Sequence, residues 1–314
     1  MLDTRIVFLE GLPGIGKSTI SQYLSLQISK NGYSTRWFYE GKFDHPTRLC
    51  SIGEYPTRAL VTQCLVQWKQ LVRSALKGRD VLIFDAVLLQ CTVLPLYLSS
   101  YNQAEIASII NEILLVVKPL NPLLIYLKDD NFKDSQKKLI KRRGVWFGEL
   151  LSNYVLNSSY GQRKVFEASE LLWIQFCEEY IQFLNRLFGL LNLDKLIVNV
   201  TGIEKNRIQE LILNSLSLNN EFQVYEPEKE IYIGTYRPVT GKFPDINIMA
   251  GSDGLIINGL LPWEDLKLLN LSTRIFLVRG WPMRIVYSES LDGFTIEENR
   301  TARFNFGRSY VRLG

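Results

Sequence analysis

Residues able to bind phosphate lie close to the start of the chain. Residues 11–18 read Gly-Leu-Pro-Gly-Ile-Gly-Lys-Ser, which matches the pattern glycine, any four residues, glycine, lysine, then serine or threonine. Glycines allow such a loop to wrap so tightly that successive backbone N–H groups face one anion. We expect Lys17 to reach the outer phosphates of a nucleotide and the Ser18 hydroxyl to bind Mg²⁺. The residues expected to contact the nucleotide are Gly11, Gly14, Ile15, Gly16, Lys17, Ser18 and Thr19.

The segments on either side of this loop support a phosphate site. An apolar run at residues 5–10 has the length of a buried strand, and a helical pattern follows at residues 17–30, closed by Asn31-Gly32. The N-terminal end of a helix carries a positive dipole end, which favours an anion. The motif therefore lies at a strand–helix junction, and an incidental glycine turn with an exposed lysine is the weaker interpretation.

Two acidic side chains lie at the ends of later predicted strands. Glu40 ends a strand predicted at residues 34–40, and Asp85 lies near the end of an almost wholly apolar strand at residues 80–86. The carboxyl ends of neighbouring parallel strands converge at the edge where open α/β sheets bind ligands. A charge beside so much apolar sequence requires a partner, and we expect Asp85 to hold Mg²⁺. The alternatives are a general base or a helix cap for Asp85, and a solvated acid for Glu40.

Strand and helix patterns alternate through the first two-thirds of the chain. Further strands are predicted at residues 122–128 and 195–200, and further helices at residues 103–117, 163–190 and 205–217. This alternation predicts an α/β fold of the P-loop NTPase type, with a central parallel sheet flanked by helices. We expect residues 1–218 to form this domain.

The pattern changes in the last third of the chain. Short apolar runs are separated there by turn signals such as Asp253-Gly254 and Asp292-Gly293. We expect residues 222–314 to form a small antiparallel, all-β accessory domain. Such a domain would serve as a lid, a homodimer contact or a specificity element.

A phosphate-binding loop is compatible with three classes of protein. A GTP switch needs an Asn/Thr-Lys-x-Asp motif, but the nearest match, residues 127–130, lacks the leading polar residue. An ATPase motor usually places a glutamate directly after its magnesium-binding aspartate, whereas Ala86 follows Asp85 here. This weakens the motor interpretation without excluding it. A small-molecule kinase must instead bring a second substrate to the γ-phosphate and keep water away.

The spacing of these features is similar to that of a known group of enzymes. The phosphate-binding loop, the second strand, the acid of the third strand and the basic segment at residues 133–143 together resemble the nucleoside and nucleotide kinase group of P-loop proteins, which includes thymidylate kinase-like enzymes. The resemblance covers about residues 5–215 and is specific at residues 11–18. The Asp-Arg or Glu-Arg-Ser sequence usual after the third strand is replaced here by Asp85-Ala86. The resemblance implies ATP and Mg²⁺ as cofactors.

The resemblance also assigns roles to individual residues. In deoxynucleoside kinases the glutamate that ends the second strand takes the proton of the acceptor hydroxyl, a role that falls here to Glu40. A mobile lid in the same group supplies arginines, which implies that Arg142 or Arg143, just before Gly144, stabilises charge on the transferred phosphoryl group. A solvated basic helix face is the alternative. Gln90 is expected to face the same cleft. Weaker candidates for the base are Asp44 and His45.

These features predict an ATP-dependent phosphotransferase. Its acceptor would be a hydroxyl group of a small molecule such as a nucleoside, an amino sugar or an antibiotic-like metabolite. One alternative is a nucleotide kinase, whose phosphate acceptor needs no general base. The other is a nucleotide-gated ATPase or binding protein that acts through its β domain.

The composition restricts partners and location. A net charge of +4 over 314 residues gives little reason to expect a nucleic-acid partner, and one histidine with four scattered cysteines argues against a zinc site. The most apolar stretch, residues 113–127, is broken by Lys118, Pro119 and Pro122, so we expect no membrane span. The N-terminal residues lack the regions of a signal peptide, which predicts a cytoplasmic protein.

Overall fold

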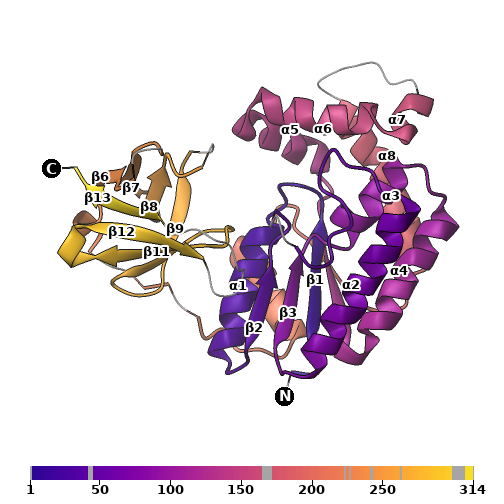
Figure 1. Ribbon diagram of the computed structural model, residues 1–314, viewed down its shortest axis with the longest axis horizontal. Helices are drawn as coiled ribbons and strands as arrows, with labels where there is room; N and C mark the ends of the chain where they lie inside the picture. Colours follow the sequence, from indigo (N-terminus) through magenta and orange to yellow (C-terminus); the bar gives the residue numbers. More distant parts are fainter. Residues whose placement is uncertain are drawn as a thin grey trace. The chain divides into compact units, whose positions relative to one another are not determined.

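The computed structural model divides into two compact units (Figure 1). The first unit comprises Met1–Lys17 and Glu40–Leu218, and the second comprises Ser18–Tyr39 and Asn219–Gly314. The described residues are 2–41, 45–164, 172–222, 224–225, 228–240, 243–261, 264–298 and 308–313.

A parallel sheet forms the centre of the α/β fold. Its strand order is β2-β3-β1-β4-β5, and the pairs β1–β3, β1–β4 and β4–β5 are parallel. Strands β1 and β3 are buried along their whole length because helices cover both faces of a parallel sheet. The strands are β1 (Ile6–Gly11), β2 (Thr35–Phe38), β3 (Val81–Asp85), β4 (Pro122–Lys128) and β5 (Asp194–Asn199). All five predicted strands are confirmed.

Helices connect the strands of the first unit. Figure 1 shows α5, α6 and α7 together beyond the carboxyl ends of these strands, and α2 packs against α4. A short helix, η2 (Lys118–Leu120), lies in a connection of this unit, and two others, η3 (Lys229–Ile231) and η4 (Glu289–Leu291), belong to the second unit. The α-helices of this unit are α2 (Arg58–Leu76), α3 (Leu94–Leu98), α4 (Gln103–Val117), α5 (Phe132–Arg143), α6 (Val145–Leu156), α7 (Ser159–Lys164), α8 (Leu172–Phe188) and α9 (Lys205–Ser215). The predicted fold class is therefore confirmed in this part of the chain.

Within the described residues, the helix expected at residues 163–190 corresponds to the end of α7 and to α8, and residues 165–171 lie outside the described residues. One helical feature differs from the sequence prediction. A π-helix, η1 (Leu89–Val93), follows β3 and leads into α3. A stretch of five residues is too short for hydrophobic periodicity to reveal a π-helix, although such turns often occur at functional sites.

The second unit contains helix α1 (Lys17–Lys30) from Ser18 onward, together with a closed antiparallel β-barrel. The barrel order is β10-β11-β12-β13-β6-β7-β8-β9. Alternating apolar residues fill its interior, among them Tyr236, Phe276 and Phe294. The strands are β6 (Gly234–Pro238), β7 (Ile246–Gly251), β8 (Gly254–Asn258), β9 (Leu266–Asn270), β10 (Ile275–Val278), β11 (Met283–Ser288), β12 (Gly293–Glu298) and β13 (Arg308–Arg312). The predicted all-β C-terminal region is confirmed.

Within the second unit, α1 is hydrogen-bonded to the barrel through Gln22. This side chain is 1% exposed, and its Nε2 donates to the carbonyls of Val278 and Trp281 at 3.0 Å each. Its Oε1 accepts from the Gly280 amide at 2.8 Å. One glutamine therefore satisfies three backbone groups of the turn between β10 and β11, and it holds this turn against α1.

Replacing Gln22 with alanine is expected to lower the free energy of unfolding by about 2–4 kcal/mol, because two carbonyls and one amide lose their buried partner. Chemical denaturation measures this change. Gln63, which is exposed on α2, provides a matched control, and its replacement by alanine should change stability by less than about 0.5 kcal/mol. Equal stability of the two variants would contradict a supporting role for Gln22.

Among the described residues, no helix combines the length and the apolar composition that crossing a bilayer requires.

Candidate functional site

The glycine-rich loop at residues 11–18, hereafter the P-loop because its sequence matches that motif, follows β1 directly. Gly14 and Gly16 have φ angles of +80° and +101°, which other residues rarely adopt. A Cβ added at Gly16 would meet nothing within 4 Å, so the loop has open space on that side. The Lys17 side chain is 4% exposed and its Nζ donates to the Leu12 carbonyl at 3.0 Å. The loop thus holds a buried ammonium group against its own backbone and leaves open space at Gly16.

Helix α5 packs on the P-loop through two side chains. Gln136 Nε2 donates to the Pro13 carbonyl at 2.8 Å, and Gln136 Oε1 accepts from Trp173 Nε1 at 2.9 Å. A Cβ added at Gly14 would lie 2.7 Å from Leu139 Cδ2, so α5 approaches the loop closely. The helix that carries the predicted lid arginines is therefore anchored to the P-loop one turn before them.

The two predicted arginines lie at the end of α5 in different environments. Arg143 is partly buried, and its guanidinium lies 4.6 Å from the centre of the Phe147 ring. It follows Leu139 by four residues, so it shares the helix face that packs on the P-loop. Arg142 is exposed. Gly144, with a φ of +92°, ends the helix directly after them. Of the two, Arg143 is the better placed, and its role remains a prediction.

Glu40 and Gln90 lie together. Gln90 Nε2 donates to Glu40 Oε2 at 2.5 Å, and Arg48 donates to the Glu40 backbone carbonyl at 2.7 Å. Glu40 follows β2 by two residues, and Gln90 belongs to η1, which follows β3. The hydrogen bond brings the ends of the segments that follow β2 and β3 together, and a role of Gln90 toward a substrate stays a prediction.

The end of β3 is buried and strained. Asp85 is fully buried, and Ala86 has a φ of +60°, which is unfavourable for a residue with a side chain. Strain of this kind persists where surrounding contacts hold it, and it is frequent at functional sites. The role of Asp85 as a ligand of Mg²⁺ stays a prediction, for which a carboxylate is a suitable donor.

Glu10, the last residue but one of β1, is not among the candidates of the sequence analysis, which treats it only as the last residue of the apolar run at residues 5–10. Its side chain is fully buried, and Oε1 accepts from the Leu88 amide at 2.6 Å. Burial raises the pKa of this carboxyl from its ordinary value of 4.5 to about 7, although the Leu88 amide and Lys17 lower it. A charged residue ending an apolar strand directly before the P-loop was the signal that could have revealed it.

A pocket of about 330 Å³ opens beside the P-loop. It lies between the loop, the start of α5 and the chain that follows β4 and β5, and polar groups dominate its wall. The lining residues are Gly14, Ile15, Asp129, Asn131, Asp134, Ser135, Lys138, Val200, Thr201 and Gly202. A volume near the lower limit of ligand sites suits part of a nucleotide.

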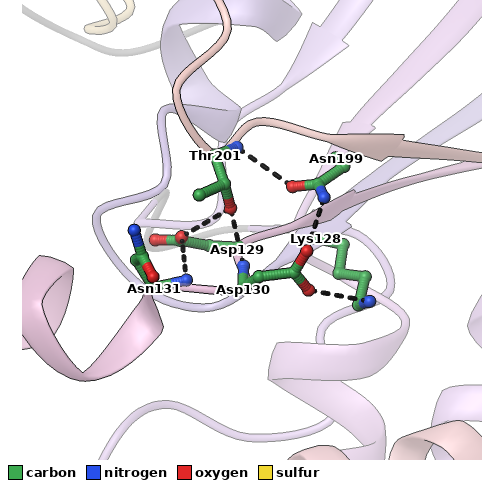
Figure 2. A network of polar contacts seen from close by, with 6 residues as sticks. All are labelled: Lys128, Asp129, Asp130, Asn131, Asn199 and Thr201. Atoms are coloured by element: carbon green, nitrogen blue, oxygen red, sulfur yellow. Dashed lines mark hydrogen bonds and ion pairs between the residues drawn. The ribbon is translucent and has the colours of Figure 1, made fainter.

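Figure 2 shows the polar network that forms one wall of this pocket. The Thr201 hydroxyl donates to Asp129 Oδ1 at 3.1 Å and accepts from the Asp130 amide at 2.7 Å. Asn199 Nδ2 donates to Asp130 Oδ2 at 2.6 Å, and Lys128 forms an ion pair with Asp130 at 2.8 Å. These contacts lower the pKa of Asp130, with the Lys128 contact contributing most. The network ties the ends of β4 and β5 together.

Replacing Thr201 with valine is expected to weaken nucleotide affinity roughly threefold to tenfold, the equivalent of one lost hydrogen bond in the pocket wall. Thr201→Ser keeps the hydroxyl and should bind nucleotide as the unaltered chain does. Titration calorimetry with a non-hydrolysable ATP analogue measures both affinities. Equal affinities of the valine and serine variants would show that the Thr201 hydroxyl and its network do not contribute to nucleotide binding.

The remaining candidates occupy different settings. His45 is buried and its Nδ1 accepts from the Thr47 amide at 3.3 Å, while Asp44 lies outside the described residues. Ser18 is the second residue of α1. The described residues contain no cluster of three or more histidine, cysteine, aspartate or glutamate side chains able to hold a metal. The predicted ligands, the Asp85 carboxylate and the Ser18 hydroxyl, are of the oxygen type that Mg²⁺ binds. This ion usually needs few protein ligands, because it keeps several waters and binds phosphate oxygens.

Known proteins resemble this chain in structure rather than in sequence. No protein-family model and no curated protein matches the sequence. The structure is similar to that of thymidylate kinase from Candida albicans, with 14% identity over 68% of this chain and 91% of that one and a TM-score of 0.41. It is also similar to deoxyadenosine kinase from M. mycoides, with 17% identity over 68% and 99% of the two chains and a TM-score of 0.38. At these identities the likeness is one of fold alone.

Proposed function

We propose that this chain is an ATP- and Mg²⁺-dependent phosphotransferase that acts on a hydroxyl group of a small molecule. A nucleoside, an amino sugar and an antibiotic-like metabolite are the acceptor classes to consider. The observation that carries the proposal is the hydrogen bond between Gln90 and Glu40, which holds a carboxylate beside the segment that follows Asp85.

The nucleotide would lie along the P-loop. Its phosphates would accept hydrogen bonds from the backbone amides of Gly14, Ile15, Gly16 and Thr19. The Lys17 ammonium would donate to a phosphate oxygen instead of to the Leu12 carbonyl. Its base and ribose would extend into the pocket walled by Thr201 and Asp129. Mg²⁺, bound by Ser18 and Asp85, would supply neutralising charge for the phosphates.

The acceptor hydroxyl would lie against Glu40. Gln90 donates to Oε2, so Oε1 lies outside that hydrogen bond and can accept the proton of a substrate hydroxyl. The same arrangement fixes the carboxylate in one orientation, which a general base requires for efficient proton transfer. Arg143 or Arg142 would approach the transferred group from the end of α5 and stabilise its charge.

A second function is favoured by the contacts of α1. Gln22 joins this helix to the turn between β10 and β11, and Gln27 Oε1 accepts from the amides of Glu221 and Phe222 at 2.9 Å each. A ligand on the barrel could therefore influence the helix that begins in the P-loop. In this alternative the barrel, within an accessory domain at residues 222–314, binds a partner under the control of ATP. A nucleotide kinase remains the nearer alternative.

An acceptor panel distinguishes these functions. The purified chain is incubated with ATP and Mg²⁺, and products are identified by ³¹P NMR and mass spectrometry. Phosphorylation of a nucleoside, an amino sugar or an antibiotic-like metabolite supports the proposal, and phosphorylation of a nucleoside monophosphate supports a nucleotide kinase. Release of inorganic phosphate that no acceptor accelerates would refute both and favour the nucleotide-gated protein.

A further inference from the structure

The carboxylate of Glu10 has no part in the roles proposed above. It is fully buried at the end of β1, directly before the P-loop. Oε1 accepts from the Leu88 amide at 2.6 Å, and Oε2 has no hydrogen-bond partner among the described residues. Burying a carboxyl group is costly, and its contact with a backbone amide of another segment points to a positional task.

Glu10 points away from the predicted metal ligand Asp85. Leu9 pairs with Asp85 across β1 and β3, and Glu10 pairs with Tyr126 across β1 and β4. Successive residues of a strand face opposite sides of the sheet, so Glu10 and Asp85 lie on different faces. The Glu10 carboxylate is thus directed to the backbone after β3 rather than to a shared metal site.

The segment after β3 is held by hydrogen bonds to two elements, β1 and α8. The Ala86 amide donates to the backbone of β1 at 2.9 Å, and the Leu88 amide donates to Glu10. From α8, the Tyr180 hydroxyl donates to the Leu89 carbonyl at 2.8 Å. Glu10 therefore supplies the acceptor for N–H groups where η1 begins, at a position where the backbone is already strained at Ala86.

The start of η1 determines where Gln90 points. The π-helix is closed by hydrogen bonds from Cys91 to Ala86 and from Val93 to Leu88, each at 3.0 Å. Gln90 comes two residues after Leu88 and reaches Glu40 with its side-chain amide. A shift of the Leu88 amide would therefore shift Gln90 and loosen the hydrogen bond on Glu40.

We propose that Glu10 is a positioning residue whose buried carboxylate fixes the start of η1 and thereby sets Gln90 against Glu40. The effect on turnover rests on the proposed function, because it requires that Glu40 act on an acceptor. The effect on the Leu88 amide does not depend on that function.

The electrostatic surroundings of Glu10 agree with this role. The titratable groups that face it are Lys17, Tyr126, Tyr180 and Cys91. Burial raises the pKa of Tyr126 to about 12 and the pKa values of Tyr180 and Cys91 well above their ordinary range, so these three stay neutral near pH 7. A carboxylate accepts a stronger hydrogen bond than a carboxylic acid, so the hold on Leu88 should tighten as the pH rises through about 7.

Amide exchange at Leu88, measured by NMR without ligand, tests the contact itself. Glu10→Leu keeps apolar bulk and removes the acceptor, whereas Glu10→Gln keeps an acceptor oxygen. After correction for intrinsic rates, we expect Leu88 to exchange roughly tenfold faster in the leucine variant and near the normal rate in the glutamine variant. Equal protection in all three chains would overturn the inference. If the leucine variant does not fold, the glutamine variant provides the test. In that variant, the protection of the Leu88 amide should no longer increase with pH. An increase equal to that of the unaltered chain would contradict the proposal.

Turnover provides the second readout. With an accepted substrate, Glu10→Leu should lower kcat while KM for ATP stays within about twofold. Because Glu10 acts through Gln90, combining this change with Gln90→Ala should slow turnover no more than the more damaging single change. If the double variant instead lowers turnover by the product of the two single effects, the positioning role is overturned. If no acceptor is phosphorylated, the proposed function fails, and exchange at Leu88 still decides the role of Glu10.

Discussion

Replacing Lys17 with alanine is expected to reduce phosphoryl transfer by roughly a thousandfold, the scale seen when one preorganised charge is removed from an active site. The Lys17 ammonium is buried within the P-loop and donates to the Leu12 carbonyl. Its desolvation has therefore taken place before any phosphate arrives, and at low dielectric its attraction for the phosphate oxygens is strong. Both the affinity for ATP and the rate of transfer should fall.

The control for this change lies on the same helix. Lys30 is exposed in the last turn of α1, so Lys30→Ala alters the charge of the chain equally but leaves the P-loop unchanged. Calorimetric titration with an ATP analogue and single-turnover assays measure binding and transfer, and circular dichroism verifies folding. A folded Lys17→Ala chain that binds ATP and transfers phosphate normally would refute the P-loop as the nucleotide site.

Local signals in the sequence specified several elements closely. The helices predicted at residues 17–30 and 103–117 coincide with α1 and α4 at both ends. The physical reasons are local: α1 begins in a glycine loop, and α4 begins with a capping box in which the side chains of Asn102 and Glu105 each accept from the other residue's amide. The apolar runs of β1, β3 and β4 likewise reveal buried strands of a parallel sheet.

Long-range structure could not be predicted in the same way. Turn signals reveal the barrel strands, but closure depends on the pairing of β6 with β13. No local pattern specifies that pairing, because the two strands are far apart in sequence.

The candidate site shows the same limit. The sequence reveals the P-loop motif because its residues are contiguous, and it singles out Glu40 and Asp85 as candidates because each lies at or just after the end of a predicted strand. The hydrogen bond between Asp129 and Thr201 joins residues 72 positions apart, and it became visible in the structure. Glu10 was overlooked because its importance lies in its burial, which composition does not reveal.

Replacing Glu40 with glutamine is expected to lower turnover of a hydroxyl acceptor by roughly a hundredfold to ten-thousandfold, the usual contribution of general base catalysis. The glutamine oxygen can still accept from Gln90, so the local structure and the affinity for ATP should be retained. The side chain can then no longer take up the proton of the hydroxyl. The loss should therefore appear in kcat, with KM for ATP close to normal.

The matched control for Glu40 is Glu112→Gln on α4, because Glu112 is exposed and removing its charge should leave turnover unchanged. Steady-state kinetics with the acceptor found in the panel gives kcat and KM for each chain. Near-normal kcat in Glu40→Gln would exclude a hydroxyl acceptor activated by this residue. It would favour a phosphate acceptor instead, because a phosphate oxygen is already deprotonated near neutral pH and attacks without a base. The hydrogen bond from Gln90 would then serve to shape the acceptor site rather than to hold a catalytic base.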